Sequence, residues 1–421
     1  MIKLLHFSDA HIDIANQGKR DPKTGLPIRV MDFLRALDTI IDTAIDEKVD
    51  LVLFAGDAYK DRTPVPTFQR EWGRRIIRLS QAKIPTILLV GNHDISPAIG
   101  RASALHEFST LEIPYIHLIS QPSLITPAQI DNLPIQILAL PWVTKSGYLS
   151  TLQNEEIDPK NLDSSIEHIL TKIIDNLIDQ LDPTLPTIFT AHASIQGAVY
   201  GEERSIMLGQ DMILPISLVK RPIFDYVALG HIHKAQNLNE DFHPPIIYPG
   251  SIEKVDFGEV KDDKFFVIAE VEKGNTSVFW QKLDGRVFLD ISINLNEIER
   301  EDDLSTPLPE DIRNFIMEKL PDLDEVEDTI TRITLNYQKN WESIINDNWI
   351  HEYFSKALEI HLIRKPVFST RLRLSEDQAI SNLSPEDLLK KYWQTIDTPE
   401  NEITELQIIA KEIIYNQNKN T

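Results

Sequence analysis

The sequence predicts a layered α/β fold for residues 1–261. Short apolar segments typical of buried strands alternate there with longer segments whose apolar residues recur at helical spacing. This alternation is the order expected of an α/β layered domain. Five of the expected strands also end in a polar or glycine-led cluster, and ligands collect at the carboxyl ends of strands in such sheets. The two observations together predict a layered domain with one shared site.

The order of the elements follows from their apolar residues. Apolar runs typical of buried strands cover residues 2–7, 51–54, 87–90, 135–140, 187–190 and 226–229. Helical segments are expected over residues 30–45, 67–79 and 166–181.

The pattern changes after about residue 260. Antiparallel strands are expected at residues 264–271, 277–282 and 287–295, and a further alternating strand at residues 330–337. We therefore expect a smaller α+β domain over residues 262–370.

The last part of the chain predicts two helices. Each begins with a capping residue followed by proline, at Ser384-Pro385 and at Thr398-Pro399, so a helical tail is expected over residues 380–416. The apolar stripes of these helices can pack on the chain's own core or on a partner, and aromatic anchors favour a partner. The expected partner-binding residues are Leu389, Tyr392, Trp393, Leu406 and Ile409.

Composition narrows the class of protein. The 421 residues suffice for two or three domains at roughly 150 residues each. There is no cysteine, which excludes disulfides and thiolate metal sites and leaves His, Asp, Glu and Asn as metal ligands. An apolar run of about 18 residues and a signal-peptide pattern are both absent, so we expect a cytoplasmic protein without a membrane span.

The net charge of −23 argues against a stand-alone DNA-binding protein, because such proteins usually carry a basic face that neutralises phosphates. Two interpretations stay open. Either the substrate is not a nucleic acid, or DNA is held by local basic patches, bound metals and a partner. One modest basic group is formed by Arg74, Arg75, Arg78 and Lys83, although such groups are most often solvated faces.

The polar clusters supply the groups that divalent first-row metals bind in catalytic sites. Together they contain Asp9, His11, Asp57, Asn92, His93, His192, His231 and His233. Residues two apart in an extended segment point the same way, so each Asp-x-His or His-x-His pair can direct two groups to one point. Any one pair occurs often by chance, but five clusters at five strand ends favour a metal site.

The chemistry of the clusters favours two metals. Asp57 is the natural candidate for a bridging carboxylate, and Asn92 offers a neutral carbonyl oxygen to one metal. Two metals about 3.5–4 Å apart activate water near neutral pH and stabilise both oxygens of an in-line displacement at phosphorus.

His93 is expected to act on the substrate, because adjacent residues of an extended chain point apart and Asn92 already faces the metals. It could protonate the leaving oxygen or stabilise the transition state, and Asp94 could orient its ring. The remaining histidines lie outside the clusters and are expected to be surface or hydrogen-bonded core residues: His6, His106, His117, His168, His243, His351 and His361.

In their order, these clusters resemble the calcineurin-like metallophosphoesterase superfamily. The matching motifs are Asp9-x-His11, Gly56-Asp57, Gly91-Asn92-His93-Asp94, His192 and Gly230-His231-x-His233. Residues 248–259 (YPGSIEKVDFGE) resemble most specifically the nuclease branch of that superfamily, the SbcD-type exonuclease subunits. The resemblance covers roughly residues 1–260 strongly and the rest of the chain only by layout.

The resemblance implies a layered β-sandwich flanked by helices, with two divalent metal ions, preferably Mn²⁺. One metal would be held by Asp9, His11, Asp57 and His233, and the other by Asp57, Asn92, His192 and His231. His93 would be the transition-state histidine.

The resemblance also implies an activity and partners. The activity is Mn-dependent 3′-to-5′ exonuclease action on duplex DNA, with endonuclease action on single strands and hairpins, in DNA repair and recombination. The smaller domain would cap DNA beside the metals, and the tail helices would dock onto a coiled-coil ABC-type ATPase of the SbcC type. Two nuclease subunits, dimerised through helices near the first motifs, would assemble with two ATPases.

One position departs from the family. Many relatives carry His or Asp three residues after the bridging aspartate, where this chain has Lys60, which could contact a phosphate but cannot replace a carboxylate. Two alternatives stay open: a protein phosphatase or small-molecule phosphodiesterase on the same fold, or a weakly catalytic scaffold that tethers DNA to the ATPase. Residues 56–62 match the phosphatase motif only in part, because the spacing is one residue too long.

Overall fold

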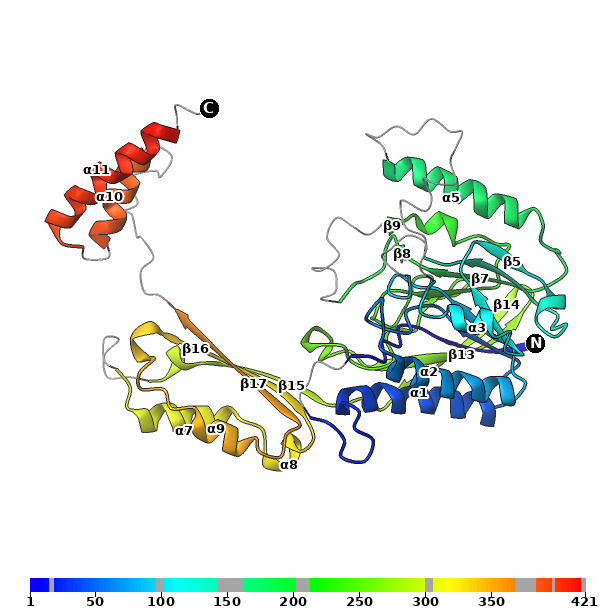
Figure 1. Cartoon of the computed structure of the whole chain (residues 1–421), viewed down its shortest axis with the longest axis horizontal. Coiled ribbons are helices and arrows are strands. Elements are labelled where there is room, and N and C mark those ends of the chain that lie inside the picture. Colours follow the sequence, from blue (N-terminus) through cyan, green and yellow to red (C-terminus); the bar gives the residue numbers. More distant parts are fainter. Residues whose placement is uncertain are drawn as a thin grey trace. The chain divides into compact units, whose positions relative to one another are not determined.

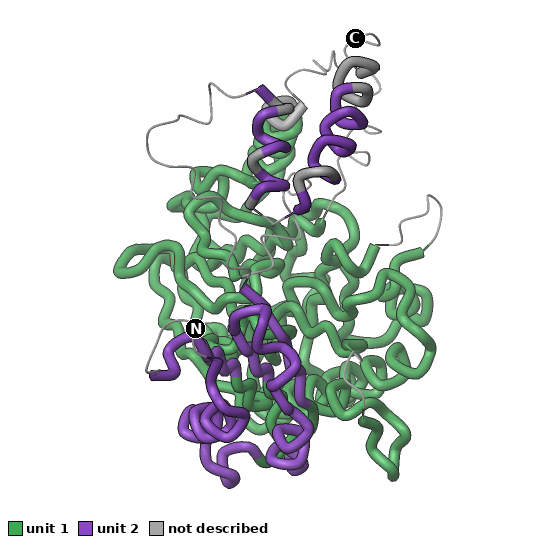
Figure 2. Tube along the Cα trace, turned by 90° about the vertical axis from the view of Figure 1, so that its left-hand side faces the viewer, with its two compact units in different colours: residues 1–289, 327–331, 357–359 green, residues 290–326, 332–356, 360–421 purple. Residues whose placement is uncertain are grey.

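The computed structural model describes residues 1–14, 19–95, 102–142, 162–201, 213–299, 306–367, 384–395 and 398–417. The chain folds into two compact units, each of which has most of its contacts within itself (Figure 2). The first contains residues 1–289, 327–331 and 357–359, and the second contains residues 290–326, 332–356 and 360–421.

Two six-stranded sheets form the first unit (Figure 1). The order of the first sheet is β14 (Asn275–Leu283), β13 (Lys264–Glu272), β1 (Ile2–Phe7), β2 (Leu51–Phe54), β3 (Thr86–Leu89) and β4 (Ile116–Ile119). The order of the second is β11 (Gln236–Asn237), β12 (Ile246–Tyr248), β10 (Tyr226–Gly230), β7 (Thr187–His192), β6 (Gln136–Leu140) and β5 (Ser123–Ile125). Strands β1 to β4 run parallel, as do β6, β7, β10 and β12, so their carboxyl ends lie along one edge of each sheet.

The two sheets pack face to face because successive side chains of a strand point to opposite faces. Leu4 of β1 and Ile188 of β7 lie in one buried cluster that combines residues of both sheets. Leu5, the next residue of β1, instead packs with Val30 of a helix on the outer face. Both faces of the strands are therefore buried, as their continuous apolar runs require.

Helices cover the two outer faces (Figure 1). The helices α1 (Ile28–Asp46) and α2 (Pro66–Gln81) pack on the first sheet, and α5 (Leu162–Ile178) packs on the second. Proline at the first position of α2 suits a helix start, where its missing N–H costs nothing. The layered α/β fold that the sequence predicts is confirmed.

The first unit extends beyond residue 261, where the sequence predicted a domain boundary. Strand β13 pairs antiparallel with β1, with Leu5 opposite Ile268, and β14 pairs along the whole of β13. Val267 of β13 is fully buried in the core between the sheets. Residues 264–283, which the apolar pattern placed in the smaller domain, thus complete the first sheet.

The second unit is of the α+β type. Its three-stranded sheet has the order β15, β16, β17. The elements are β15 (Phe288–Asn294), α7 (Pro309–Lys319), α8 (Leu323–Val326), β16 (Ile330–Gln338), α9 (Asn348–Tyr353) and β17 (Glu359–Val367). Residues 368–370 of the expected smaller domain lie outside the described residues.

The tail forms the two expected helices, α10 (Pro385–Thr395) and α11 (Glu400–Gln417), which pack against each other. Ser384 caps α10 through its hydroxyl, which accepts from the backbone N–H of Asp387 at 3.2 Å. Of the five proposed partner-binding residues, Tyr392 and Ile409 are exposed, and Leu389, Trp393 and Leu406 are half-buried. Residues 380–383 and 396–397 of the expected tail are not among the described residues. Every described helix is too short or too polar to span a membrane.

Candidate metal centre

The polar clusters meet at one edge of the sandwich. The seven expected metal ligands follow or end β1, β2, β3, β7 and β10, and they are Asp9, His11, Asp57, Asn92, His192, His231 and His233. All seven are buried. Strands β7 and β10 are in register there, with Gly230 opposite His192.

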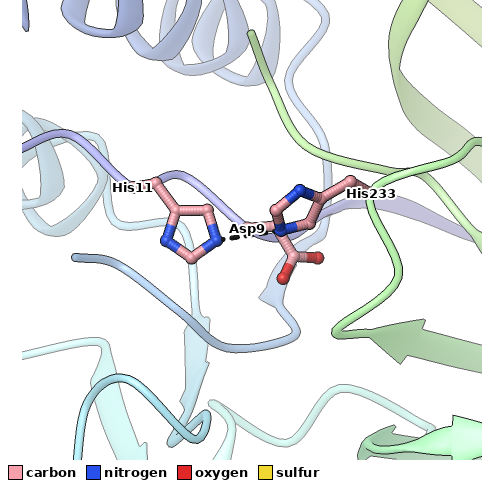
Figure 3. A group of neighbouring side chains, drawn as sticks. All are labelled: Asp9, His11 and His233. Atoms are coloured by element: carbon pink, nitrogen blue, oxygen red, sulfur yellow. Dashed lines mark hydrogen bonds between the residues drawn. The ribbon is translucent and has the colours of Figure 1, made fainter. Parts of the chain in front are cut away.

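Six of these residues form two groups with the geometry of a metal site. The first group is Asp9, His11 and His233 (Figure 3). The second group is Asp57, His192 and His231. Within each group, one ligand atom from every residue lies within 4.8 Å of the others. In the first group, Nε2 of His11 faces Nε2 of His233 at 3.1 Å.

Asp57 lies between the two groups. Its Oδ2 is 3.3 Å from Nε2 of His192 in the second group and 4.0 Å from Nε2 of His11 in the first. Asn92 adds a neutral oxygen to the second group, because its Oδ1 is 2.9 Å from Nε2 of His192 and 2.9 Å from Nδ1 of His231. These positions are compatible with a bridging role for Asp57 and a neutral-ligand role for Asn92.

The ring nitrogens on the far side of the centre are held by acceptors outside it. From Nδ1, His11 and His192 donate to backbone carbonyl oxygens at 3.2 and 2.7 Å, and His233 donates to the carboxylate of Glu259 at 2.8 Å. A ring that donates outward from Nδ1 keeps the lone pair of Nε2 toward the centre, as metal-binding histidines do. The donor set therefore fits a dimetal site.

Glycines let these loops approach one another. A Cβ atom on Gly56 would lie 2.3 Å from Nδ1 of His192, and one on Gly91 would lie 2.2 Å from Oδ1 of Asp57. Four ligands also have left-handed backbone angles, with φ of +51° at Asp9, +40° at His11, +63° at Asp57 and +100° at His231. Such angles cost about 1–3 kcal/mol each and persist where the surroundings over-determine them, which is common at functional sites.

Asp94 joins two of the ligand loops. Its fully buried carboxylate accepts from the backbone N–H groups of Asp57 at 3.0 Å, Ala58 at 3.0 Å and Gly91 at 2.9 Å. Burial, with the charge of Asp57, raises the pKa of Asp94 to about 7. The sequence suggested that Asp94 orients the ring of His93. In the structure its carboxylate instead bonds to these backbone N–H groups.

The ring of His93 is instead held by the loop after β2. Its Nδ1 lies 2.7 Å from the carbonyl oxygen of Lys60, and its centroid lies 5.3 Å from that of His11. The backbone N–H of His93 donates to Oδ1 of Asp57 at 2.8 Å. His93 is half-buried beside the centre, and Lys60 is exposed. Burial lowers the pKa of His93, and Lys60 adds to that effect against the charge of Asp57.

The charges of the centre are strongly linked. Burial alone raises the pKa of Asp57, but His192 and the other histidines nearby hold it well below its usual range. Burial lowers the pKa of His192, but Asp57 raises it to about 9. A ligating imidazole must be neutral, so metal binding at the second group would release a proton.

Sequence reasoning missed two residues around the centre. Glu259 bonds to His233, and it ends the family-specific segment 248–259, which was the available signal. Trp142 follows β6, and its indole lies 5.1 Å from the ring of His231 and 6.2 Å from that of His192. A single tryptophan after a strand does not indicate, from the sequence, that its ring lies beside metal-site histidines.

The arginines of α2 pair with acidic neighbours. Arg75 and Arg78 bind Asp38 of α1 at 2.8 and 3.2 Å, and Arg74 binds Glu71 at 3.2 Å. The basic group noted in the sequence is thus largely neutralised within the first unit, as a solvated helix face would be.

Several known proteins resemble the chain. It is 25% identical over 274 residues to the SbcD component of the SbcCD nuclease of Staphylococcus epidermidis, and the alignment covers 64% of this chain and 66% of that one, just under two thirds. The structure of TT1561 of Thermus thermophilus has a TM-score of 0.39 at 13% identity, covering 66% of this chain and 98% of that one. A dimetal phosphatase from Danio rerio has a TM-score of 0.39 at 10% identity, covering 67% and 96%.

The family model of the calcineurin-like phosphoesterases matches residues 2–235. This segment contains 234 of the 421 residues and all seven residues of the centre. The chain therefore belongs to the calcineurin-like phosphoesterase family, whose fold implies a phosphoester hydrolase.

Proposed function

We propose that this chain is a two-metal DNA nuclease of the SbcD type. The observation that supports this most is the pair of His/Asp groups with Asp57 between them at one edge of the sandwich. A phosphodiester displacement needs stabilisation of both the attacking and the leaving oxygen, which two adjacent sites provide.

In this proposal each ligand has one role. Asp9, His11 and His233 would hold one metal, Asn92, His192 and His231 would hold the other, and Asp57 would contact both. The bound cations would lower the pKa of water to supply the nucleophile and would offset the phosphate charge. His93 donates from Nδ1 to the carbonyl of Lys60, so only the doubly protonated imidazolium ring would carry a second proton, on Nε2, for the leaving oxygen.

DNA is the proposed substrate, and Mn²⁺ the preferred metal. Similarity to a nuclease component supports the substrate, as does the segment 248–259, and oxygen and imidazole ligands suit Mn²⁺. We expect 3′-to-5′ exonuclease action on duplexes and endonuclease action on single strands and hairpins, in DNA repair and recombination. The exposed ammonium of Lys60, beside His93, suits a phosphate contact.

A partner completes the proposal, because a chain with a net charge of −23 gains affinity for DNA from other basic surfaces. The helices α10 and α11 would dock onto a coiled-coil ABC-type ATPase, and the second unit would cap DNA. Two copies of this chain would assemble with two ATPases. Deleting residues 380–421 should then abolish ATPase binding and leave hydrolysis of a small phosphodiester intact, and loss of both would contradict the docking role.

The decisive experiment compares wild type, His93→Ala and His351→Ala on two substrates, with Mn²⁺ or Mg²⁺. The substrates are end-labelled duplex DNA and bis-p-nitrophenyl phosphate. His351 is an exposed histidine of α9, so its variant is the matched control. We expect Mn-dependent DNA degradation that falls about 10²–10⁴-fold in His93→Ala alone, with metal content unchanged.

Two other outcomes would replace the proposal. Turnover of the small ester with DNA untouched, even with the ATPase added, would indicate a small-molecule phosphodiesterase and would point to Lys60 as the cause. DNA binding without hydrolysis of either substrate would indicate a tethering scaffold.

A further inference from the structure

His233 differs from His11 and His192 in the group that accepts a hydrogen bond from its Nδ1. Its Nδ1 lies 2.8 Å from Oε1 of Glu259, whereas His11 and His192 donate to neutral backbone carbonyls. Glu259 is only 3% exposed. A full negative charge therefore lies directly behind one ligand of the first group, and the second group has a carbonyl in the equivalent place behind His192.

The carboxylate of Glu259 is itself firmly held. Its Oε2 forms an ion pair with Nζ of Lys264 at 2.6 Å and accepts from the backbone N–H of Val255 at 2.9 Å. Lys264 is buried and also donates to the hydroxyl of Ser251 at 2.7 Å. Because Lys264 is the first residue of β13, which pairs with β1, the ion pair is anchored to the sheet that leads to Asp9.

We propose that Glu259 is a positioning residue that supports the metal of the first group and not that of the second, with Lys264 as its buried counter-charge. The proposal rests on the two-metal centre described above. A carboxylate behind an imidazole fixes the ring, selects the tautomer with a free Nε2 and makes that nitrogen a stronger donor. Loss of such a partner typically weakens metal binding about 10–100-fold.

A second carboxylate in the same segment provides a matched control. Glu253 is also buried, and its oxygens accept from the backbone N–H of Lys254 at 2.8 Å and of Arg286 at 3.0 Å. Glu253 supports the chain connection after β14 and forms an ion pair with Arg29 at 4.0 Å, and these contacts lie outside both metal groups. A general loss of buried charge in this segment would affect both variants, whereas of these two carboxylates it is Glu259 that bonds to the ring of His233.

The test titrates the full-length chain with Mn²⁺ alone and follows heat by calorimetry and metal coupling by electron paramagnetic resonance. The variants are Glu259→Gln, Glu253→Gln and the charge-balanced pair Glu259→Gln with Lys264→Met. His11→Ala and His192→Ala identify which binding event belongs to which group. We expect Glu259→Gln and the double variant to weaken the first-group event about 10–100-fold and to leave the second within about threefold, while Glu253→Gln keeps both.

Three results would overturn the proposal. Unchanged binding of both metals in the two Glu259 variants would remove the positioning role. Equal weakening of both binding events would show that Glu259 has a general structural role rather than a selective one. If the unpaired Lys264 prevents Glu259→Gln from folding, the double variant still tests the proposal. Wild type that binds fewer than two Mn²⁺ ions would overturn the two-metal function together with this inference.

Discussion

The two candidate metal groups each contain one aspartate and two histidines, but they are held in place by different parts of the chain. The first group depends on a buried ion pair, Glu259 with Lys264, which lies outside the ligand motifs. The second group depends on Asp94, whose carboxylate gathers three backbone N–H groups of the ligand loops themselves. We therefore expect that each group can be weakened separately, although the two groups share one edge of the sandwich.

The groups are also joined at two points. Asp57 lies between them, and both oxygens of Asp9 accept from the backbone N–H of His231, at 3.1 and 3.0 Å. A substitution at a joining point should affect both groups, and a substitution in one set of supports should weaken that group more than the other.

The largest effect is expected at Asp57, which faces both groups. Asp57→Asn keeps the shape but removes the charge, so both sites should lose affinity and turnover of bis-p-nitrophenyl phosphate should fall about 10³-fold, equivalent to several kcal/mol. Metal content by mass spectrometry and turnover at saturating Mn²⁺ check this. Retention of one full equivalent of metal would show that Asp57 belongs to a single group.

The next effect is expected at Asp94, on the side of the second group. Asp94→Ala leaves three buried backbone N–H groups without their acceptor, and each such loss costs about 1–3 kcal/mol. Urea unfolding of the metal-free protein should show a loss of about 3 kcal/mol or more, and Mn²⁺ titration should show a weakened second-group event. Asp94→Asn, which keeps one acceptor oxygen, should lose less. Selective loss of the first-group event would contradict the separation of supports.

A smaller effect is expected at Trp142, which lies beside both histidines of the second group. Trp142→Ala should let water reach His192 and His231. The apolar residues around a metal site control solvent access and so influence how strongly its ligands bind the metal. The affinity of the second group for Mn²⁺ should fall by roughly tenfold or less, which is the smallest loss usual when a residue around the metal ligands is replaced. Trp142→Phe should restore most of it, and calorimetry with Mn²⁺ measures both. A stronger change in the first group would refute this placement of the indole.

The smallest effect is expected at His6 of β1, and it concerns stability rather than metal binding. Its Nδ1 lies 3.0 Å from the hydroxyl of Tyr226, and this contact joins β1 to β10, the strands that lead to the two groups. Burial lowers the pKa of His6 to about 3. Between about pH 3 and the ordinary pKa of 6.5, His6 is protonated in the unfolded chain and neutral in the folded one. The free energy of unfolding therefore falls as the pH falls below about 6.5.

From pH 7 to pH 5.5 this loss should be about 1 kcal/mol. His6→Gln should not show it, and urea unfolding of wild type and variant at the two pH values measures the difference. Other titrating groups are the same in both proteins, so their contributions cancel. An equal pH dependence in the two proteins would mean that His6 is not held neutral in the fold.

Local patterns in the sequence were enough to predict the layered α/β fold and the residues that meet at its edge. Apolar runs and helical spacing are local patterns, and they predicted every strand that carries a ligand. The ligand types were also local, since each polar cluster follows its strand directly. Gly56 and Gly91 belong to those clusters, and the structure explains them, because a Cβ atom at either would overlap a neighbouring site residue.

The supports of those residues and the end of the first unit depend on long-range contacts, which the folded structure reveals. Strand β13 completes the sheet by pairing with β1, more than 250 residues earlier, and nothing in its own alternation distinguishes it from a strand of the smaller domain. The bond from His233 to Glu259 and the bonds from Asp94 to the ligand loops likewise depend on how distant segments fold back. Periodicity and spacing describe neighbours along the chain, whereas these contacts form between residues that only the folded sheets bring together.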